Sequence, residues 1–287
     1  MAEIISGTAM AATLTASLEV EVARFTSLRG FAPTLAVILV GNDAASAIYV
    51  QRKIAQCGKV GIRSIEHRFD TTCSERALLD VIADLNADPQ VHGILVQLPL
   101  PAQIDSHKVL DAIDPAKDVD GFHPVNVGRL SSGTGGLLPC TPMGCMMLLE
   151  SVVPDFKGQQ AVVIGKSNIV GKPVALLLLE RECTVTVTHI HTRGLSDIVR
   201  SADILVVAAG SPGLVRGDWV KPGAIVIDVG INRQVSDEGK VSIRGDVAFE
   251  QVQHAAAITP VPGGVGPMTI ACLLLNTVKA ARQQSPA

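Results

Sequence analysis

The chain has 287 residues, a net charge of −3 and a hydrophobic share of 47%, which is enough for two ordinary domains. Its apolar runs are shorter than the roughly 18 to 20 residues of a membrane-spanning helix, so we exclude a membrane protein and expect strands buried on both faces. The chain has no basic run and only one Trp and one Tyr, which gives no basis for nucleic-acid binding.

The N-terminus and the cysteines favour a reduced, cytoplasmic location. Met1–Ile5 shows no basic region followed by an apolar core, as a secretory signal would. None of the six cysteines forms a CxxC pair, and a core of this size does not need disulfides. We therefore expect free thiols in the cytoplasm.

Residues 1–113 alternate between helical and strand patterns. Such alternation predicts right-handed crossovers and a mostly parallel sheet. The expected elements are helices at about 9–27, 44–60, 75–86 and 106–113, and strands at about 35–40, 62–69 and 94–98.

The segment Asp114–Pro142 interrupts this alternation and is rich in Gly, Pro, Ser and Asp, which predicts a long connection with functional content. The second alternating series comprises strands at 161–164, 184–188, 204–207 and 224–229 and helices at 170–180 and about 268–282. We predict an α/β protein of two domains, 1–120 and 121–287, with an active-site cleft between them. The second domain should be a Rossmann-like parallel sheet, and the last helix should pack back on the first domain.

A glycine turn at Gly165 joins the strand 161–164 to the helix that follows. A pyrophosphate could bind there to free backbone N–H groups at the positive end of the helix. The next strand leads into His189-Ile190-His191-Thr192-Arg193, without the carboxylate that usually takes the ribose hydroxyl of NAD. Lys166 and Arg193 are candidates for a 2′-phosphate, so the pattern favours NADP, although Arg193 is nearly as well explained as a solvated surface charge.

His189 and His191 are two residues apart and would share one face of a strand. A zinc site needs further ligands, and no Cys, Asp or Glu nearby completes a set. We therefore predict no metal.

Tyr49, Lys53 and Cys57 are spaced four apart on a predicted helix and share one face. This face begins just after a parallel strand ends, where ligands of open α/β sheets collect. A lone lysine is usually a solvated charge, but Gln97 ends a very apolar strand and should point into the same crevice.

Asp118 and Asp120 lie in the irregular connection. A carboxylate there could bind a flat guanidine-like edge through two hydrogen bonds. On spacing alone, a role in forming a turn is the preferred explanation for both residues, because Asp-Gly is a common turn pair.

These motifs together resemble the bifunctional methylenetetrahydrofolate dehydrogenase/methenyltetrahydrofolate cyclohydrolase family over nearly the full length of the chain. The motifs are Tyr49–Lys53, Gln97–Pro101, Lys117–Phe122, Gly165–Pro173, Asp228–Asn232 and Thr259–Thr269.

The resemblance implies a role for each matching residue of the folate site. Lys53 matches the catalytic lysine and Gln97 its hydrogen-bonding partner. Tyr49 matches the residue that stacks on the aminobenzoyl group, and Asp120 the carboxylate that holds the pterin edge. The further expected folate contacts are Leu98, Pro262 and Gly263.

For the cofactor, the resemblance implies that Gly165, Lys166 and Ser167 form the phosphate loop and that Ile231 contacts the nicotinamide side. Lys166 stands where many relatives carry Arg, which gives a point charge instead of a planar fork. Ile190 stands where relatives often carry a polar or basic residue. Both departures bear on the NADP preference. The resemblance also implies tetrahydrofolate substrates in one-carbon metabolism and purine biosynthesis, and a homodimer.

The implied chemistry has two steps. Hydride passes from the folate one-carbon bridge to the nicotinamide, and water then opens the methenyl product to 10-formyltetrahydrofolate. We expect Lys53 to move the protons of the second step, with Gln97 orienting its amine. Three alternatives remain: a member with dehydrogenase activity alone, another two-domain NADP-dependent dehydrogenase, and a nucleotide-sensing protein without catalytic activity.

Overall fold

The computed structural model describes residues 1–235 and 241–285. The chain forms two compact units: the first comprises Met1–Ala11 with Thr141–Thr269, and the second comprises Ala12–Cys140 with Ile270–Ala287. Among the described residues, none of the helices has both the length and the apolar character that crossing a bilayer requires.

The second unit is built on a three-stranded parallel sheet in the order β3-β2-β4. The central strand β2 (Thr34–Val40) is apolar after its first residue and buried along its whole length. It pairs with β3 (Arg63–Phe69) on one side and β4 (Gly93–Val96) on the other. A strand with two neighbours and both faces covered has no edge left for solvent, which explains its continuous apolar run.

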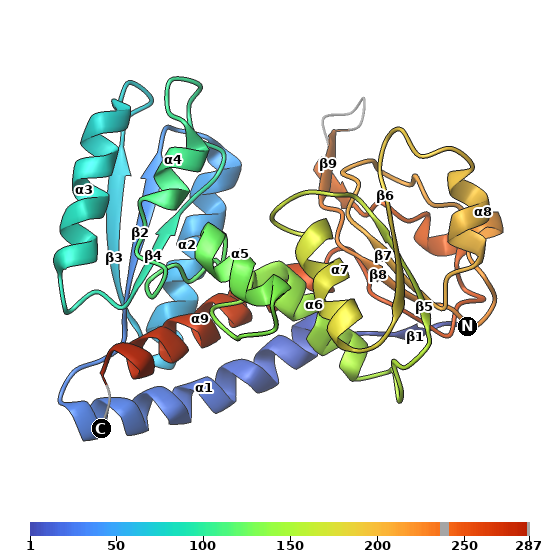
Figure 1. Ribbon diagram of the computed structural model, residues 1–287, viewed down its shortest axis with the longest axis horizontal. Helices are drawn as coiled ribbons and strands as arrows, with labels where there is room; N and C mark the ends of the chain where they lie inside the picture. Colours follow the sequence, from blue (N-terminus) through green and yellow to red (C-terminus); the bar gives the residue numbers. More distant parts are fainter. Residues whose placement is uncertain (236–240, 286–287) are drawn as a thin grey trace. The chain divides into compact units, whose positions relative to one another are not determined.

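The helices of this unit begin and end at recognisable capping residues. Asp43 caps α2 (Ala44–Val60) by accepting the Ser46 N–H at 2.7 Å, and Gly61 ends it with φ of 80°. Ser74 likewise caps α3 (Glu75–Ala87), which lies along the sheet in Figure 1 and packs its apolar side against the core that includes β2.

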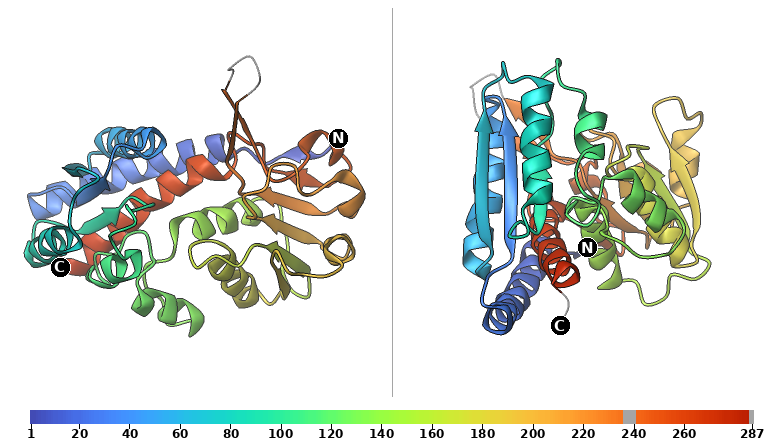
Figure 2. Two further views of the ribbon diagram at one scale, coloured as in Figure 1. Left: turned by 90° about the horizontal axis from the view of Figure 1, so that it is seen from above. Right: turned by 60° about the vertical axis from the view of Figure 1, so that its left-hand side comes forward.

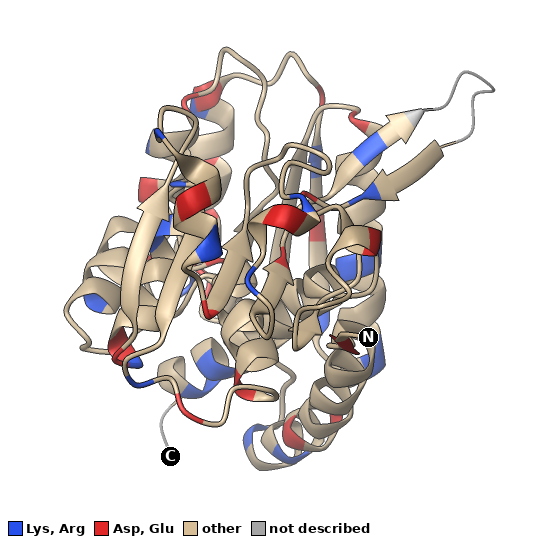
Figure 3. Cartoon of the chain, turned by 90° about the vertical axis from the view of Figure 1, so that its right-hand side faces the viewer, with Lys and Arg blue, Asp and Glu red and all other residues tan. Residues whose placement is uncertain are grey.

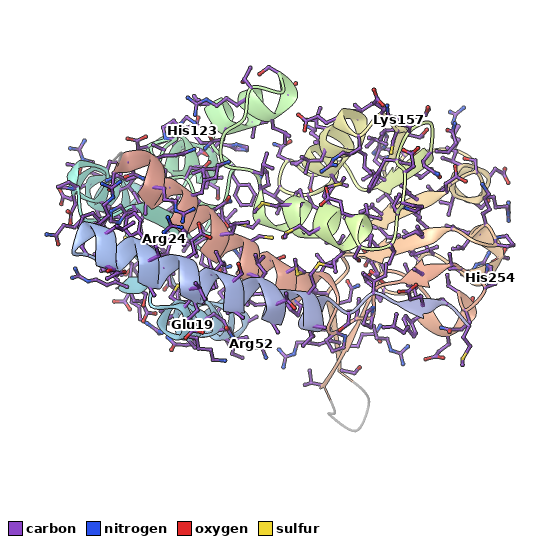
Figure 4. All side chains as sticks on the ribbon, turned by 90° about the horizontal axis from the view of Figure 1, so that it is seen from below. Glu19, Arg24, Arg52, His123, Lys157 and His254 are labelled. Carbon is purple, nitrogen blue, oxygen red and sulfur yellow. The ribbon has the colours of Figure 1, made fainter. Side chains whose placement is uncertain are left out.

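The predicted long connection after residue 113 contains more helix than expected. It follows α4 (Ser106–Asp111) and includes α5 (Pro124–Ser131) and the start of α6 (Cys140–Glu150). The His123 side chain, labelled in Figure 4, caps α5, and Pro124 occupies its first turn. Part of the connection that we predicted to be irregular is therefore helical.

Two long helices complete the second unit, α1 (Gly7–Arg29) from Ala12 onward and α9 (Val265–Gln284) from Ile270 onward. They run side by side in Figure 1 and Figure 2 and are joined by an ion pair between Glu21 and Arg282. Asn276 on α9 donates hydrogen bonds of 2.8 Å to the carbonyl oxygens of Val119 and Leu138.

The division of the chain differs from the boundary at 120/121 that we expected from the sequence. Contacts divide it at 11/12, 140/141 and 269/270. The segment after residue 120 belongs to the second unit because its polar groups bond there. Asn126, for example, donates to the Asp118 carboxylate at 2.9 Å and to the Pro115 carbonyl at 2.8 Å.

The first unit contains a six-stranded parallel sheet in the order β1-β11-β8-β7-β5-β6, which confirms the Rossmann-like prediction. The strands are β1 (Glu3–Ile4), β5 (Gln160–Ile164), β6 (Thr184–Thr188), β7 (Ile204–Val207), β8 (Ile225–Asp228) and β11 (Ala257–Ile258). Its other elements are α7 (Gly171–Glu180), α8 (Leu195–Arg200), the antiparallel hairpin of β9 (Asn232–Val235) and β10 (Val241–Arg244), and short 3-10 turns at Gly217–Trp219 and Phe249–Gln251.

Figure 2 shows the β9–β10 hairpin projecting from the six-stranded sheet. Figure 3 shows acidic and basic residues interspersed along the ribbons, in keeping with the small net charge of the chain.

Candidate functional site

Lys53 lies on the buried face of α2, although the preceding residue faces solvent. Its relative exposure is 8%, whereas Arg52, labelled in Figure 4, is exposed. The Lys53 Nζ donates to Gln97 Oε1 at 3.1 Å, and Gln97 Nε2 donates to the Leu98 carbonyl at 2.7 Å. The second bond fixes the amide so that its oxygen faces the ammonium group. A buried ammonium group with a neutral, oriented acceptor is not a solvated surface charge.

The strand that carries Gln97 is shorter than predicted, because β4 ends at Val96 instead of Leu98. The Gln97 N–H still donates to the Ile38 carbonyl at 2.9 Å, which continues the β2 pairing by one residue. Pro99 follows Leu98 and has no N–H to donate. The chain therefore leaves the sheet at the point where the Gln97 side chain reaches Lys53.

Asp120 lies in a turn that Asp118 holds in place. The buried Asp118 carboxylate accepts N–H groups from Phe122 at 3.2 Å and His123 at 2.8 Å. Turn formation thus explains Asp118 but not Asp120, whose carboxyl interacts with the Cys140 side chain. Burial raises the pKa of Asp120, as does the Asp118 charge, while the nearby Lys53 ammonium opposes the shift.

The other two residues of the predicted helix face flank Lys53 by one turn each. Tyr49 is half-buried, and burial raises the pKa of its phenol, so the ring stays neutral and available for stacking. Burial raises the pKa of the Cys57 thiol to about 12. Cys57 is therefore a packing residue and not a nucleophile.

The glycine turn after β5 forms a tight cradle in the first unit. Gly165 has a φ of 117°, and a Cβ there would lie 2.2 Å from the Ala208 carbonyl oxygen. The Ser167 hydroxyl accepts the N–H groups of Val170 at 3.1 Å and Gly171 at 3.3 Å, where α7 begins. Lys166 is exposed at the same turn. A close backbone approach at a helix N-terminus fits a pyrophosphate.

We expect Gly165→Ala to raise the KM for NADP by about tenfold or more, because the new methyl group collides with backbone and the positive φ is strained. Steady-state dehydrogenase kinetics at varied NADP measure this. Gly158→Ala is the matched control, since Gly158 has a φ of 71° but open space where an added Cβ would lie. Equal KM values for both variants would show that the collision at Gly165 does not affect the cofactor.

The remaining predicted residues of the first unit are solvent-accessible. Ile190 is 92% exposed and Ile231 is 50% exposed. Pro262 is exposed, and the Gly263 carbonyl accepts the Thr8 N–H at 2.9 Å. The structure therefore groups Tyr49, Lys53, Gln97, Leu98 and Asp120 in the second unit, and it places the predicted cofactor residues with Pro262 and Gly263 in the first.

The two histidines considered for metal binding are not on a common strand face, because β6 ends at Thr188. The rings of His189 and His191 lie 6.0 Å apart at a steep angle, and His189 Nδ1 accepts the His191 N–H at 3.2 Å. Over residues 1–235 and 241–285, no three His, Cys, Asp or Glu residues are grouped as a metal site requires.

Asp246 was not among the residues predicted from the sequence. It is completely buried and accepts hydrogen bonds from the loops that follow β7 and β8. Asp228, which was noted only as part of a motif, is 3% exposed and lies beside it. The one available signal was the Gly245-Asp246 pair, which resembles an ordinary turn.

Burial raises the pKa of Asp228 from 3.8 to about 6, against the opposing effect of three backbone N–H donors. A carboxyl whose pKa is raised by folding stabilises the fold fully below its unfolded pKa and loses this contribution as pH rises through the folded value. We therefore compare the free energies of unfolding of the native chain and of Asp228→Asn. The native value minus the variant value should fall by up to about 3 kcal/mol between about pH 4 and pH 7. Denaturant unfolding at several pH values measures this difference, and a constant difference would contradict the assignment.

Comparison with known proteins gives consistent matches over both units. The model of the tetrahydrofolate dehydrogenase/cyclohydrolase catalytic domain matches residues 5–120, and that of the NAD(P)-binding domain of the same name matches residues 139–285. A bifunctional protein FolD from Sphingobium chlorophenolicum is 68% identical over 285 residues, which is 99% of this chain and 90% of that protein.

Two solved structures are similar over nearly their whole length. The bifunctional FolD enzyme of Campylobacter jejuni has a TM-score of 0.94 and 48% identity, with 99% of this chain and 100% of that chain covered. The Trypanosoma brucei methylenetetrahydrofolate dehydrogenase-cyclohydrolase, solved with NADP and an inhibitor, has a TM-score of 0.95 and 40% identity, with 100% and 99% covered.

Proposed function

Because this chain belongs to the tetrahydrofolate dehydrogenase/cyclohydrolase family, we propose that it oxidises 5,10-methylenetetrahydrofolate with NADP and hydrolyses the 5,10-methenyl product to 10-formyltetrahydrofolate. The observation that carries the proposal is the buried Lys53, held at 3.1 Å by Gln97 and electrostatically coupled to Asp120. A dehydrogenase that only transferred hydride would not need a sheltered ammonium group.

For the first reaction, the task of the protein is to orient the two reactants. When bound, NADP would supply the acceptor for the hydride that leaves the one-carbon bridge. The Gly165 cradle, with Lys166 and Ser167, would hold its phosphates, and Ile231 would contact the nicotinamide side. Asp120 holds the pterin edge through two hydrogen bonds, and the Tyr49 ring stacks on the aminobenzoyl group. Holding the reacting carbons in contact supplies most of the rate enhancement.

For the second reaction, water adds to the methenyl carbon and the bond from this carbon to N5 breaks, which leaves the formyl group on N10. The oxygen of the added water becomes the formyl oxygen, so both of its protons leave: N5 gains one and the other is released to solvent, which balances the positive charge of the methenyl group. Lys53 Nζ accepts a proton from the added water as a general base and then donates it to N5 as a general acid. Gln97 Oε1 fixes the direction of the Nζ group without adding a charge of its own.

Further parts of the proposal concern the setting of the enzyme. Pro262 and Gly263 contact the folate. We also propose a homodimer formed through the first unit and a cytoplasmic location. The product is a one-carbon donor of the kind that purine biosynthesis consumes.

The absorbance of methenyltetrahydrofolate tests the proposal in two assays. Methylenetetrahydrofolate with NADP should give formation of the methenyl compound, and methenyltetrahydrofolate without cofactor should decay faster than it does spontaneously. Formation without accelerated decay would mean dehydrogenase activity alone. No change in either assay would overturn the proposed function.

A further inference from the structure

The buried carboxylate of Asp246 collects four hydrogen bonds from two separate loops. Its exposure is 0%. Oδ2 accepts the N–H groups of Ala209 at 2.7 Å and Gly210 at 2.9 Å, and Oδ1 accepts the Ser211 N–H at 2.8 Å and Asn232 Nδ2 at 2.7 Å. The first three donors follow β7, and Asn232 follows β8. A single side chain therefore binds the backbone that follows β7 and the side chain of a residue that follows β8.

Asp228 extends this network by a second carboxylate. Its Oδ1 accepts the N–H groups of Gly230 and Asp246, each at 2.9 Å, and its Oδ2 accepts the Val247 N–H at 2.9 Å. The packing leaves no room for larger residues here: a Cβ on Gly230 would lie 2.4 Å from Asp246 Oδ1, and one on Gly245 would lie 1.9 Å from Asp228 Oδ2.

Both loops fixed by Asp246 adjoin residues assigned to the cofactor. Ala208, directly before the three N–H donors, has the carbonyl oxygen that lies against Gly165 of the phosphate cradle. Ile231 lies between Gly230, which is bound to Asp228, and Asn232, which is bound to Asp246. Its side chain is nevertheless 50% exposed. Hydrogen bonds thus hold the residues on both sides of Ile231, while its large apolar side chain is exposed. Such a side chain is well placed to contact a ligand.

We propose that Asp246 is a positioning residue for NADP, which sets the backbone under the phosphate cradle and the presentation of Ile231. This inference rests on the proposed function. Ligands of open parallel sheets bind outside the carboxyl ends of the strands, and all four bonds to Asp246 come from that edge. Asp246 acts through these loops and touches no reacting atom.

The test is Asp246→Asn, which keeps the size of the side chain but replaces one acceptor oxygen with an NH2 group. Two of the four N–H groups that bind Asp246 would then face the new NH2 group, which cannot accept a hydrogen bond from them. We expect the KM for NADP to rise about tenfold or more, with a matching rise in the dissociation constant of NADP measured by calorimetry. The cyclohydrolase reaction, assayed without cofactor, should keep its kcat and its KM for methenyltetrahydrofolate.

Asp203→Asn is the matched control because Asp203 precedes the same strand β7 at its amino end. Its carboxylate also accepts a backbone N–H, that of Gln160 at 2.9 Å, and pairs with Lys221. Its loss should lower stability without changing the KM for NADP. Should Asp246→Asn fail to fold, Asn232→Ala removes one donor while leaving the carboxylate with its three backbone N–H groups, and it should raise the same KM by a smaller factor.

The outcomes are distinguishable. A rise in KM and dissociation constant for NADP in Asp246→Asn, with normal cyclohydrolase kinetics, supports the inference. Unchanged NADP affinity, or an equal fall in both activities with normal affinity, makes Asp246 a stabilising residue only and overturns it. If the native chain lacks both activities, the proposed function is overturned. If the native chain is active but binds NADP no more tightly than the Asp246→Asn variant, only this inference is overturned.

Discussion

Replacement of Lys53 by Met is expected to remove the cyclohydrolase activity, lowering its rate by about 10²- to 10⁴-fold, the usual contribution of a positioned general acid–base. Met is unbranched and fills similar space, but it has no proton to move and no donor for Gln97. The dehydrogenase reaction needs no proton transfer by the enzyme, so its rate should fall less. The absorbance decay of methenyltetrahydrofolate, corrected for the spontaneous reaction, measures the first effect.

Lys59→Met is the control for this experiment. Lys59 lies on the same helix α2 but is exposed in its last turn, so the same chemical change should leave both activities as they are. The variant at Lys53 should also fold, because it removes a buried charge without opening a cavity. If Lys53→Met hydrolysed methenyltetrahydrofolate at the native rate, the proton-carrying role would have to be given to another group.

The sequence predicts the longer strands of each sheet better than the shortest ones. The strand expected at 35–40 is β2, Thr34–Val40, because a central parallel strand must be apolar on both faces, and this leaves a clear run. The outer strands β1 and β11 have two residues each. So short a segment carries no periodicity, and these strands form only because a neighbouring strand offers free backbone groups: β8 to β11, and β11 to β1.

In the candidate site, the sequence predicts which side chains share a face but not the distances between them. The four-residue spacing of Tyr49, Lys53 and Cys57 predicts a common helix face, and the sequence places Gln97 at a strand end. Only the fold sets the 3.1 Å between Lys53 Nζ and Gln97 Oε1, across 44 residues of chain. The individual roles of these residues came from the resemblance to a family, and not from the spacing.

Asp246 escaped notice for a related reason. Its partners are mostly backbone N–H groups 35 to 37 residues earlier in the chain, and every residue except proline has such a group. The donors therefore leave no pattern of side chains in the sequence. A buried acceptor for backbone donors is recognised only when the loops are in place.

The second large effect is expected for Asp120→Asn, which should lower kcat/KM for both reactions by about 10- to 10²-fold. An amide offers one acceptor where the carboxylate offers two to the pterin edge, and a hydrogen bond to a charged group contributes about 1.5–3 kcal/mol. Both reactions bind the same pterin, so both should weaken, mainly through the KM for the folate. Steady-state kinetics of the two reactions at varied folate concentration measure this.

The stability of Asp120→Asn should change in the opposite sense, because burial raises the pKa of Asp120 in the folded chain. Its contribution to the free energy of unfolding is complete at pH values below its unfolded pKa and is lost as pH rises through the folded value. An asparagine has no such loss, so the native chain should become less stable relative to the variant as pH rises.

Asp118→Asn is the control for Asp120→Asn. It removes an acceptor from the turn that holds Phe122, His123 and Asn126, and it should lower stability. A variant of Asp120 that kept its folate KM would mean that this carboxyl does not hold the substrate.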